Sequence, residues 1–373
     1  MGILNRVYNW IASRRPLRDD EKNAAGYWKH AINAHQQNDS KRFASFAQQS
    51  VETATNDWEN AHAAHDHAKT NDSLEHILNV AEFDRQHSRG YPPAAARAHR
   101  DSAENLYQVV LDREPSPEQV QRVRNGLQFT YTLDSRRLAN QFKQAVNHYD
   151  NGDLNRFNKT NADIIAAYQK VVCDANARQI TGAKEAALDG MIQIANWHLE
   201  QATVYRPAVL RNKRITFGWF SLKKDVEAPL ARQLYTNHTD TAKKILEYAA
   251  KQSHRADIKR KAAYKLGELN HTLAHNHAVR ARNMLITLNG NRNLDAVESG
   301  ISALKQYDRA QAALTESLNA MPQEYIYDAR RQEIDQYLQD VCDERNNLAR
   351  AISDGEQQIF NRAALISRVY HLQ

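Results

Sequence analysis

The sequence predicts an all-α protein, a multi-helix array built as an irregular α-solenoid or a helical bundle. Glycine supplies only 12 of the 373 residues, and the eight prolines fall at breaks between periodic segments. Alanine, glutamine, arginine and leucine are abundant, whereas runs of β-branched residues are scarce. Because a chain that keeps helix breakers out of its long segments favours helix, we expect about a dozen helices with short connections.

Residues 1–18 are predicted to form an amphipathic N-terminal helix that ends at Pro16. They contain four arginines and no acidic residue. A basic amphipathic helix can lie in a membrane interface, act as an organellar targeting segment, or dock onto the first helical layer. The candidate membrane residues are Ile3, Leu4, Val7, Trp10 and Ile11.

Residues 19–205 are predicted to form an N-terminal helical domain. Aspartate and serine cap helix starts, whereas proline and glycine end helices. Residues of these types divide the segment at six places: Asp39–Ser40, Asp72–Ser73, Gly90–Pro93, Glu114–Pro117, Asp150–Asp153 and Thr181–Gly182.

Residues 206–224 are predicted to be a basic aromatic connector. Within them, residues 215–222 (ITFGWFSL) are β-prone, so we expect one short β insertion, either a small hairpin or an ordered loop. The segment from Arg206 to Lys261 has fourteen Lys or Arg and five Asp or Glu, whereas the net charge of the whole chain is only +6. The basic character is therefore a property of this region.

The connector and the helix that follows it contain the candidate binding residues. Cations can bind phosphates, and aromatic faces can stack on bases or insert into a membrane. In the alternative interpretation, the aromatic residues are core and the cations are its solvated rim. The candidates are Arg211, Lys213, Arg214, Phe217, Trp219, Phe220, Lys223, Lys224, Lys259, Arg260 and Lys261.

Residues 225–373 are predicted to form a C-terminal, helical-repeat-like domain. Its expected joints are Ser253–His254, Asn289–Asn291, Pro322 and Asp354–Gly355. Residues 291–322 are expected to form two short amphipathic helices closed by Pro322. Because such a pair cannot bury its apolar faces alone, it predicts stacked helices.

The stretch 291–322 resembles a single tetratricopeptide unit, with fainter echoes across 242–290. Two residues depart from the family pattern: Glu298 stands where the family prefers a small residue, and Ser317 replaces the usual alanine. The resemblance implies a TPR-like solenoid that holds a protein partner in a groove. The matching residues are Leu294, Val297 and Ile301 for the first helix, and Tyr307, Ala310, Leu314, Leu318 and Pro322 for the second.

Two histidine clusters are candidates for metal binding: His62, His65 and His67, and His271, His275 and His277. Glu59 and Glu268 each precede a histidine with the Glu-x-x-His spacing used by di-iron bundles. Chance pairing explains this number of matches, so we assign no metal ligand and no cofactor.

No nucleophile motif or phosphate-binding glycine loop is present, and Cys173 and Cys342 belong to no CxxC motif. The sequence therefore predicts no catalytic residue and a protein that is not an enzyme.

We expect a non-catalytic scaffold or adaptor that binds a protein partner through a helical groove. The alternatives are a nucleic-acid or anionic-membrane binder that uses residues 206–261, and a helical metalloenzyme. The sequence has no apolar run of membrane-spanning length and no secretory signal pattern. We therefore expect a cytoplasmic protein, or one that is peripheral at a membrane.

Overall fold

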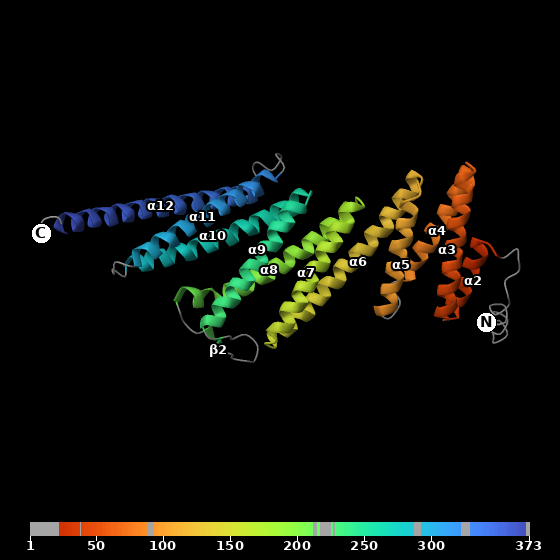
Figure 1. Ribbon diagram of the computed structural model, residues 1–373, viewed down its shortest axis with the longest axis horizontal. Helices are drawn as coiled ribbons and strands as arrows, with labels where there is room; N and C mark the ends of the chain where they lie inside the picture. Colours follow the sequence, from red (N-terminus) through yellow and green to blue (C-terminus); the bar gives the residue numbers. More distant parts are fainter. Residues whose placement is uncertain are drawn as a thin grey trace. The chain divides into compact units, whose positions relative to one another are not determined.

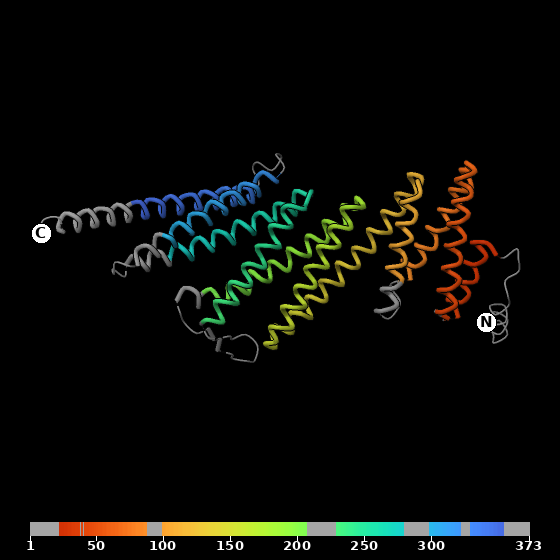
Figure 2. The backbone as a smooth tube through the Cα atoms, viewed as in Figure 1, coloured from red at the N-terminus to blue at the C-terminus, as the bar shows by residue number. Residues whose placement is uncertain are grey.

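The computed structural model describes the backbone of residues 22–37, 39–87, 93–211, 215–216, 225–226, 228–286, 292–321 and 329–370 (Figure 1). Within these ranges, side chains are described except at the segments drawn in grey in Figure 2: 40, 93–98, 207–211, 215–216, 225–226, 228, 280–286, 292–297 and 354–370. The predicted N-terminal helix 1–18 lies outside the described residues.

The described residues form eleven helices and two very short strands (Figure 1). Since almost all of the described backbone is helical, the all-α prediction is confirmed. The elements are α2 (Ala24–Gln36), α3 (Ser40–Ala63), α4 (His67–His87), α5 (Pro93–Leu111), α6 (Pro117–Asp150), α7 (Leu154–Ala177), α8 (Thr181–Arg211), β1 (Ile215–Thr216), β2 (Asp225–Val226), α9 (Ala228–Gln252), α10 (Ala256–Ile286), α11 (Arg292–Asn319) and α12 (Ala329–Tyr370).

The chain divides into two compact units. Unit 1 comprises Met1–Arg136 and Asp174–Ala183, and unit 2 comprises Arg137–Cys173 and Lys184–Gln373. The helices α6, α7 and α8 therefore contribute residues to both units. The domain boundaries expected from the sequence, after residues 18, 205 and 224, stay predictions.

The prediction of a β insertion at residues 215–222 is wrong. Among the described residues, β structure is limited to two-residue strands, with Ile215 opposite Val226 and Thr216 opposite Asp225. The second strand lies beyond the predicted segment, and residues 217–222 lie outside the described ones. Two antiparallel pairs are far below the length of an ordinary strand, so the described chain is a helical array.

Several helix boundaries follow the capping residues that the sequence contains. Asp39 Oδ1 accepts a hydrogen bond from Arg42 N at 3.1 Å, which caps α3 as expected. Pro117 is the first residue of α6, and the turn at Asp150–Asp153 separates α6 from α7 as predicted. The expected start at Asp72–Ser73 is wrong, because Asp66 accepts from Lys69 N at 3.1 Å and α4 begins at His67.

Two predicted breaks in the C-terminal half are absent. Residues 292–319 form the single helix α11 rather than a pair, and α12 continues through Asp354–Gly355. Along α11 the buried residues form one uninterrupted helical stripe, which leaves no position for a turn: Ala303, Tyr307, Ala310, Leu314 and Leu318. The two-helix tetratricopeptide unit expected at 291–322 is therefore not formed, although a stacked helical array is.

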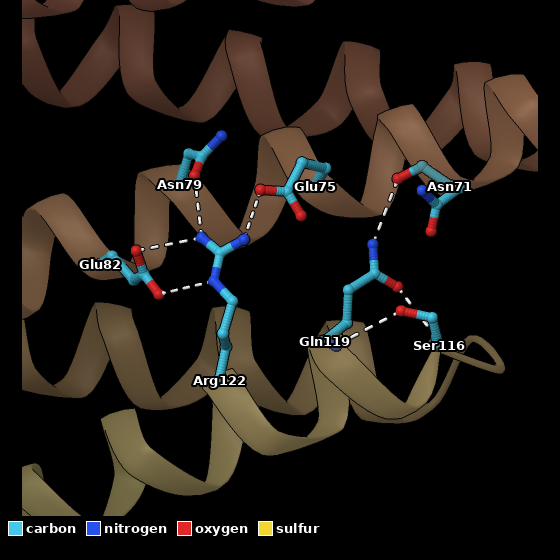
Figure 3. A network of polar contacts seen from close by, with 7 residues as sticks. All are labelled: Asn71, Glu75, Asn79, Glu82, Ser116, Gln119 and Arg122. Atoms are coloured by element: carbon cyan, nitrogen blue, oxygen red, sulfur yellow. Dashed lines mark hydrogen bonds and ion pairs between the residues drawn. The ribbon is translucent and has the colours of Figure 1, made fainter.

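In unit 1, Arg122 of α6 joins α6 to α4 (Figure 3). Its Nε and Nη2 each donate to the Glu82 carboxylate at 3.1 Å, and Nη2 also donates to Asn79 at 3.0 Å. Its Nη1 donates to Glu75. The hydrogen bond and charge of Glu82 and Glu75 outweigh partial burial and raise the pKa of Arg122. One guanidinium therefore fixes two turns of α4 against α6.

The start of α6 is fixed against the same helix. Ser116 and Gln119 form a capping box, in which Gln119 N donates to Ser116 Oγ at 3.3 Å and Ser116 N donates to Gln119 Oε1 at 3.0 Å. Gln119 Nε2 also reaches the Asn71 carbonyl of α4 at 3.3 Å (Figure 3). The cap thus sets both the first turn of α6 and its register along α4.

In unit 2, α8 and α10 lie side by side and run in the same direction. Asp189 pairs with Lys261 (Oδ1–Nζ 3.2 Å), and Arg206 Nε donates to Asn276 Oδ1 at 3.0 Å further along both helices. Between them in sequence, α9 returns antiparallel, and Glu185 of α8 holds the turn into α10. The buried Glu185 carboxylate accepts from Ser253 Oγ at 2.5 Å and from His254 N at 2.9 Å.

The helices α10 and α12 repeat this arrangement. The guanidinium of Arg330 lies 4.6 Å from the ring centroid of Tyr264, and His271 Nδ1 is 2.8 Å from the Tyr337 hydroxyl, seven residues further along each helix. The intervening α11 packs closely on α10, because a Cβ at Gly267 would lie 2.7 Å from the Leu314 side chain. Unit 2 therefore places α8, α10 and α12 in one parallel row.

A buried hydrogen-bond chain crosses the core of unit 2. His198 and His238 face each other through their Nδ1 atoms at 2.7 Å, and His238 Nε2 is 3.0 Å from the Tyr149 hydroxyl. Tyr149 contacts the Tyr205 hydroxyl, and Asn161 Nδ2 is 3.2 Å from His198 Nε2. Each imidazole supplies one donor and one acceptor, so the chain is satisfied only when both histidines are neutral.

Burial, reinforced by the neighbouring imidazole, lowers the pKa of His198 to about 3. Burial alone lowers the pKa of His238 to about 4. Both histidines therefore bind protons more weakly in the folded chain than in the unfolded one. Stability from these groups is fully present above about pH 6.5 and falls as the pH drops toward the folded pKa values.

We predict that Arg122→Ala lowers the free energy of unfolding of unit 1 by about 1 to 2 kcal/mol, because it removes the part-exposed fork between α4 and α6. Calorimetric unfolding of the intact chain measures this loss. The matched control is Arg136→Ala on the same helix, where the side chain is exposed. Equal losses for the two variants contradict a special role for Arg122.

We predict that the free energy of unfolding of unit 2 falls by about 4 kcal/mol between pH 7 and pH 5 because of His198 and His238, about 2 kcal/mol for each. Denaturant titration at several pH values measures the slope. The double variant His198→Gln and His238→Gln should lose this part of the slope, whereas the exposed-site control His254→Gln should keep it. An unchanged slope in the double variant means that other groups carry the pH dependence.

Candidate binding groove

The row of α8, α10 and α12 leaves a groove in unit 2, which consists of two connected clefts. The polar cleft has a volume of about 380 Å³ and lies between α8, α9 and α10. The cationic cleft has a volume of about 130 Å³ and lies between α8, α10 and α12. Asn196 and Lys265 line both clefts, so the clefts meet at these two residues.

The lining residues recur at helical spacing, because each helix turns one face toward the groove. The polar cleft is lined by Asn196, Leu199, Glu200, Ala202, Thr203, Arg206, Tyr235, Thr239, Lys265, Glu268, Leu269 and Thr272. The cationic cleft is lined by Ile192, Asn196, Arg260, Lys261, Tyr264, Lys265, Arg330 and Ile334. The polar cleft contains two carboxylates and two cations, whereas the cationic cleft contains four cations and no carboxylate.

The distal end of the polar cleft is held by a buried contact between helices. Asn276 Nδ2 donates to the Tyr235 hydroxyl at 2.6 Å, and Asn276 Oδ1 accepts from Arg206 Nε at 3.0 Å. Burial raises the pKa of Tyr235, so its hydroxyl stays protonated. The three side chains set the spacing of α8, α9 and α10 at this end.

Three of the four cations in the cationic cleft have an acidic partner outside its lining. Lys261 pairs with Asp189 at 3.2 Å, Lys265 with Glu268 at 2.7 Å, and Arg330 with Glu333 at 2.6 Å. Among the described side chains, Arg260 has no ion-pair partner. These ion pairs are partly exposed, so each contributes little to stability and leaves the cations available to a ligand.

The ring of Tyr264 organises two of these cations. The Arg330 guanidinium lies 4.6 Å from the ring centroid and Lys265 Nζ lies 5.8 Å from it. Burial opposes the charged form of Arg330, but its hydrogen bond with Glu333 and the nearby carboxylate charge outweigh burial and raise its pKa. Burial and the Glu268 charge raise the pKa of Tyr264. At neutral pH the cleft therefore presents cations over a neutral phenol.

At the junction of the two clefts, one hydrogen-bond acceptor has no donor. Asn196 Oδ1 is buried and has no donor among the described residues. Native structures rarely leave such an acceptor unpaired, because its desolvation is not compensated. The amide can also accept and donate at once, which suits a ligand that offers both an N–H and a carbonyl.

The structure brings Arg260 and Lys261 together in the cationic cleft, as the sequence grouped them. Lys259 is different, because it pairs with Glu316 at 3.2 Å and lines a separate, wider groove of about 900 Å³ between α10 and α11. Arg211 is the last residue of α8, with its side chain outside the described set. The other candidates lie outside the described residues: Lys213, Arg214, Phe217, Trp219, Phe220, Lys223 and Lys224, with Ile3, Leu4, Val7, Trp10 and Ile11.

Sequence reasoning missed most of the groove. Tyr264 and Lys265 follow Lys261 by one helical turn, so helical spacing from the basic cluster is a signal that points to them. Asn196 and Arg330 come from α8 and α12, and no local pattern links these residues to α10.

The two histidine clusters that the sequence offered as metal-binding candidates contact aromatic and acidic side chains. His62 stacks on Trp58 with ring centroids 4.8 Å apart. His271 lies 2.8 Å from the Tyr337 hydroxyl and 3.1 Å from Glu344 Oε2. Within the described part of the chain, no three His, Cys, Asp or Glu side chains are grouped to hold a metal ion.

No protein-family model matches this chain, and no curated protein matches it. A solved structure, described as a circular tandem repeat protein with novel repeat topology and enhanced subunit contact surfaces, is 12% identical with a TM-score of 0.23. That comparison covers 95% of this chain and 75% of the other. Since the TM-score is so low, the assignment of a stacked helical array depends on the contacts described above.

In the part of the chain that the structure describes, every helix is too short or too polar to cross a membrane.

We predict that Asn196→Leu raises the free energy of unfolding of unit 2 by about 1 kcal/mol, because it removes a buried acceptor that has no donor. Thermal unfolding of the intact chain measures the gain. Gln193→Leu is the control on the same helix, since the Gln193 side chain is exposed and no desolvated group is relieved there. A loss of stability in Asn196→Leu shows that this amide is satisfied in the folded protein.

Proposed function

We propose that this chain is a non-catalytic helical scaffold that binds an extended segment of a protein partner along the groove of unit 2. The observation that carries the proposal is the unpaired Asn196 amide oxygen at the junction of the two clefts. A peptide backbone offers the N–H donor that this oxygen lacks, and its carbonyl can accept from the same amide group.

The dimensions of the groove fit such a segment. The fifteen residues of α8 from Ile192 to Arg206 span about 21 Å along the helix axis. An extended peptide advances about 3.3 Å per residue, so the groove is long enough for about six residues. Side chains of a stacked helical array commonly line such extended binding surfaces.

The mixed charge of the groove favours protein over nucleic acid. Glu200 and Glu268 line the polar cleft together with Arg206 and Lys265, whereas the cationic cleft is lined by four cations and no carboxylate. A nucleic-acid strand places a phosphate at every nucleotide, which would bring like charges against these carboxylates. The half-buried Leu199 also offers an apolar contact to a peptide side chain.

A second candidate function is binding to nucleic acid or an anionic membrane, and the four cations of the cationic cleft favour it. This function predicts affinity that falls steeply with salt, whereas the peptide function predicts a smaller dependence.

The proposed scaffold would act in the cytoplasm or at a membrane surface, as the sequence predicts. Both cysteines are free thiols, Cys173 being exposed, which fits a reducing compartment.

Selection of short random peptides against the intact chain tests the proposal. We expect enriched peptides to bind the wild-type chain and to bind Thr203→Trp about tenfold more weakly, because the new ring fills the polar cleft. Asn158→Trp, at an exposed position on α7, is the control and should bind normally.

A selection that enriches no peptide contradicts the proposal. Equal binding of the enriched peptides to wild type and to Thr203→Trp contradicts it as well, because the peptides would then bind elsewhere.

A further inference from the structure

We infer that the cationic cleft binds a phosphate monoester carried by a side chain of the bound partner segment. The inference rests on the proposed function, because it takes the adjoining polar cleft as the site of the peptide backbone. It adds the chemistry of the partner: a phosphorylated serine, threonine or tyrosine.

The cations of the cationic cleft have more N–H donors than their described ion pairs and hydrogen bonds within the protein use. Lys261 and Lys265 each carry three N–H donors, and each makes one described ion pair. Arg260 is half-buried, lines the cleft and makes no described ion pair or side-chain hydrogen bond. A guanidinium offers five N–H donors in a planar fork that matches two phosphate oxygens.

The charge distribution selects an anion for this end of the groove. The partner carboxylates Asp189, Glu268 and Glu333 lie outside the lining of the cationic cleft. A ligand anion can therefore contact the cations without meeting a carboxylate inside the cleft. A monoester dianion gains more from four cations than a single carboxylate does, since its charge is larger and it offers three strong acceptor oxygens.

Size and rigidity also fit a tetrahedral anion. The cleft is small, with a volume of about 130 Å³, and accommodates a single tetrahedral anion. Tyr264 lies beneath Arg330 at 4.6 Å and limits the orientation of its guanidinium. A cation held in this way loses less conformational entropy when it binds.

The source of the phosphate follows from the neighbouring cleft. Glu200 and Glu268 line the adjoining polar cleft beside Arg206 and Lys265, so further phosphates of a nucleic-acid strand or of neighbouring lipid headgroups that entered it would meet carboxylates. A phosphopeptide brings one dianion and continues as a neutral backbone past Asn196. Among phosphate sources, the groove therefore favours a phosphorylated protein.

Titration calorimetry of the intact chain with inorganic phosphate and with O-phosphoserine tests the site directly. We expect saturable binding of both, weakened about tenfold or more by Arg260→Met. Arg260→Lys keeps the charge but not the fork, so it should show a smaller loss. Arg309→Met on α11 removes the same charge from an exposed position and should bind as the wild type does.

Binding that is equal in wild type and Arg260→Met, or no saturable binding, overturns the inference. If Arg260→Met is misfolded by circular dichroism, Lys261→Met provides the same test at a second cation.

Three further probes identify the phosphate source: a peptide pool with a fixed central phosphoserine, single-stranded oligouridine and phosphatidylserine vesicles. We expect the phosphopeptide pool to bind at least about tenfold more tightly than the same pool with serine. Tighter binding of the RNA or of the vesicles overturns the assignment to a phosphorylated protein.

The peptide selection described above separates the two proposals. If unphosphorylated peptides bind in the polar cleft and phosphate adds nothing, the scaffold function stands and the phosphate inference fails. If phosphate binds at Arg260 but no peptide does, the scaffold function fails.

Discussion

The packing of each long helix of unit 2 against the helix two places further along the chain is the constraint on which the candidate site depends. α8, α10 and α12 form a parallel row because α9 and α11 each return antiparallel. Polar pairs such as Arg206–Asn276 fix the register along the row. The faces that these helices turn outward make a groove, and no single helix supplies it.

Buried polar groups play two opposite roles in this protein. In the chain from Asn161 through His198 and His238 to Tyr149, each imidazole is hydrogen-bonded on both sides, so the chain specifies how four helices meet. At Asn196 a buried acceptor is left without a donor. Hydrogen-bonded imidazoles support the fold, whereas an unpaired acceptor in a cleft costs stability that a ligand can restore. Asn161 Oδ1 and Asn270 Oδ1 of unit 2 also lack a donor among the described residues, but of these three amides only Asn196 lines the clefts.

The sequence predicted the helix content well but the lengths of individual helices less well. Asp39, Pro117 and the turn at Asp150–Asp153 act locally, so their predicted effects are confirmed. Asp354–Gly355 was expected to break a helix and does not. A lone glycine costs a helix only about 1 kcal/mol, which packing can offset, as at Gly300, where a Cβ would meet Ile352 at 2.7 Å.

Composition and periodicity by themselves determined the helical class, many of the joints and the basic cluster that contains Arg260 and Lys261, because these properties depend on residues close together in the chain. Only the tertiary structure decided that residues 292–319 form one helix and that Asn196, Tyr264 and Arg330 surround the same cleft. Such residues meet through the register of helices that lie more than sixty positions apart in sequence. That register is set by side-chain packing and buried polar pairs, which no local pattern records.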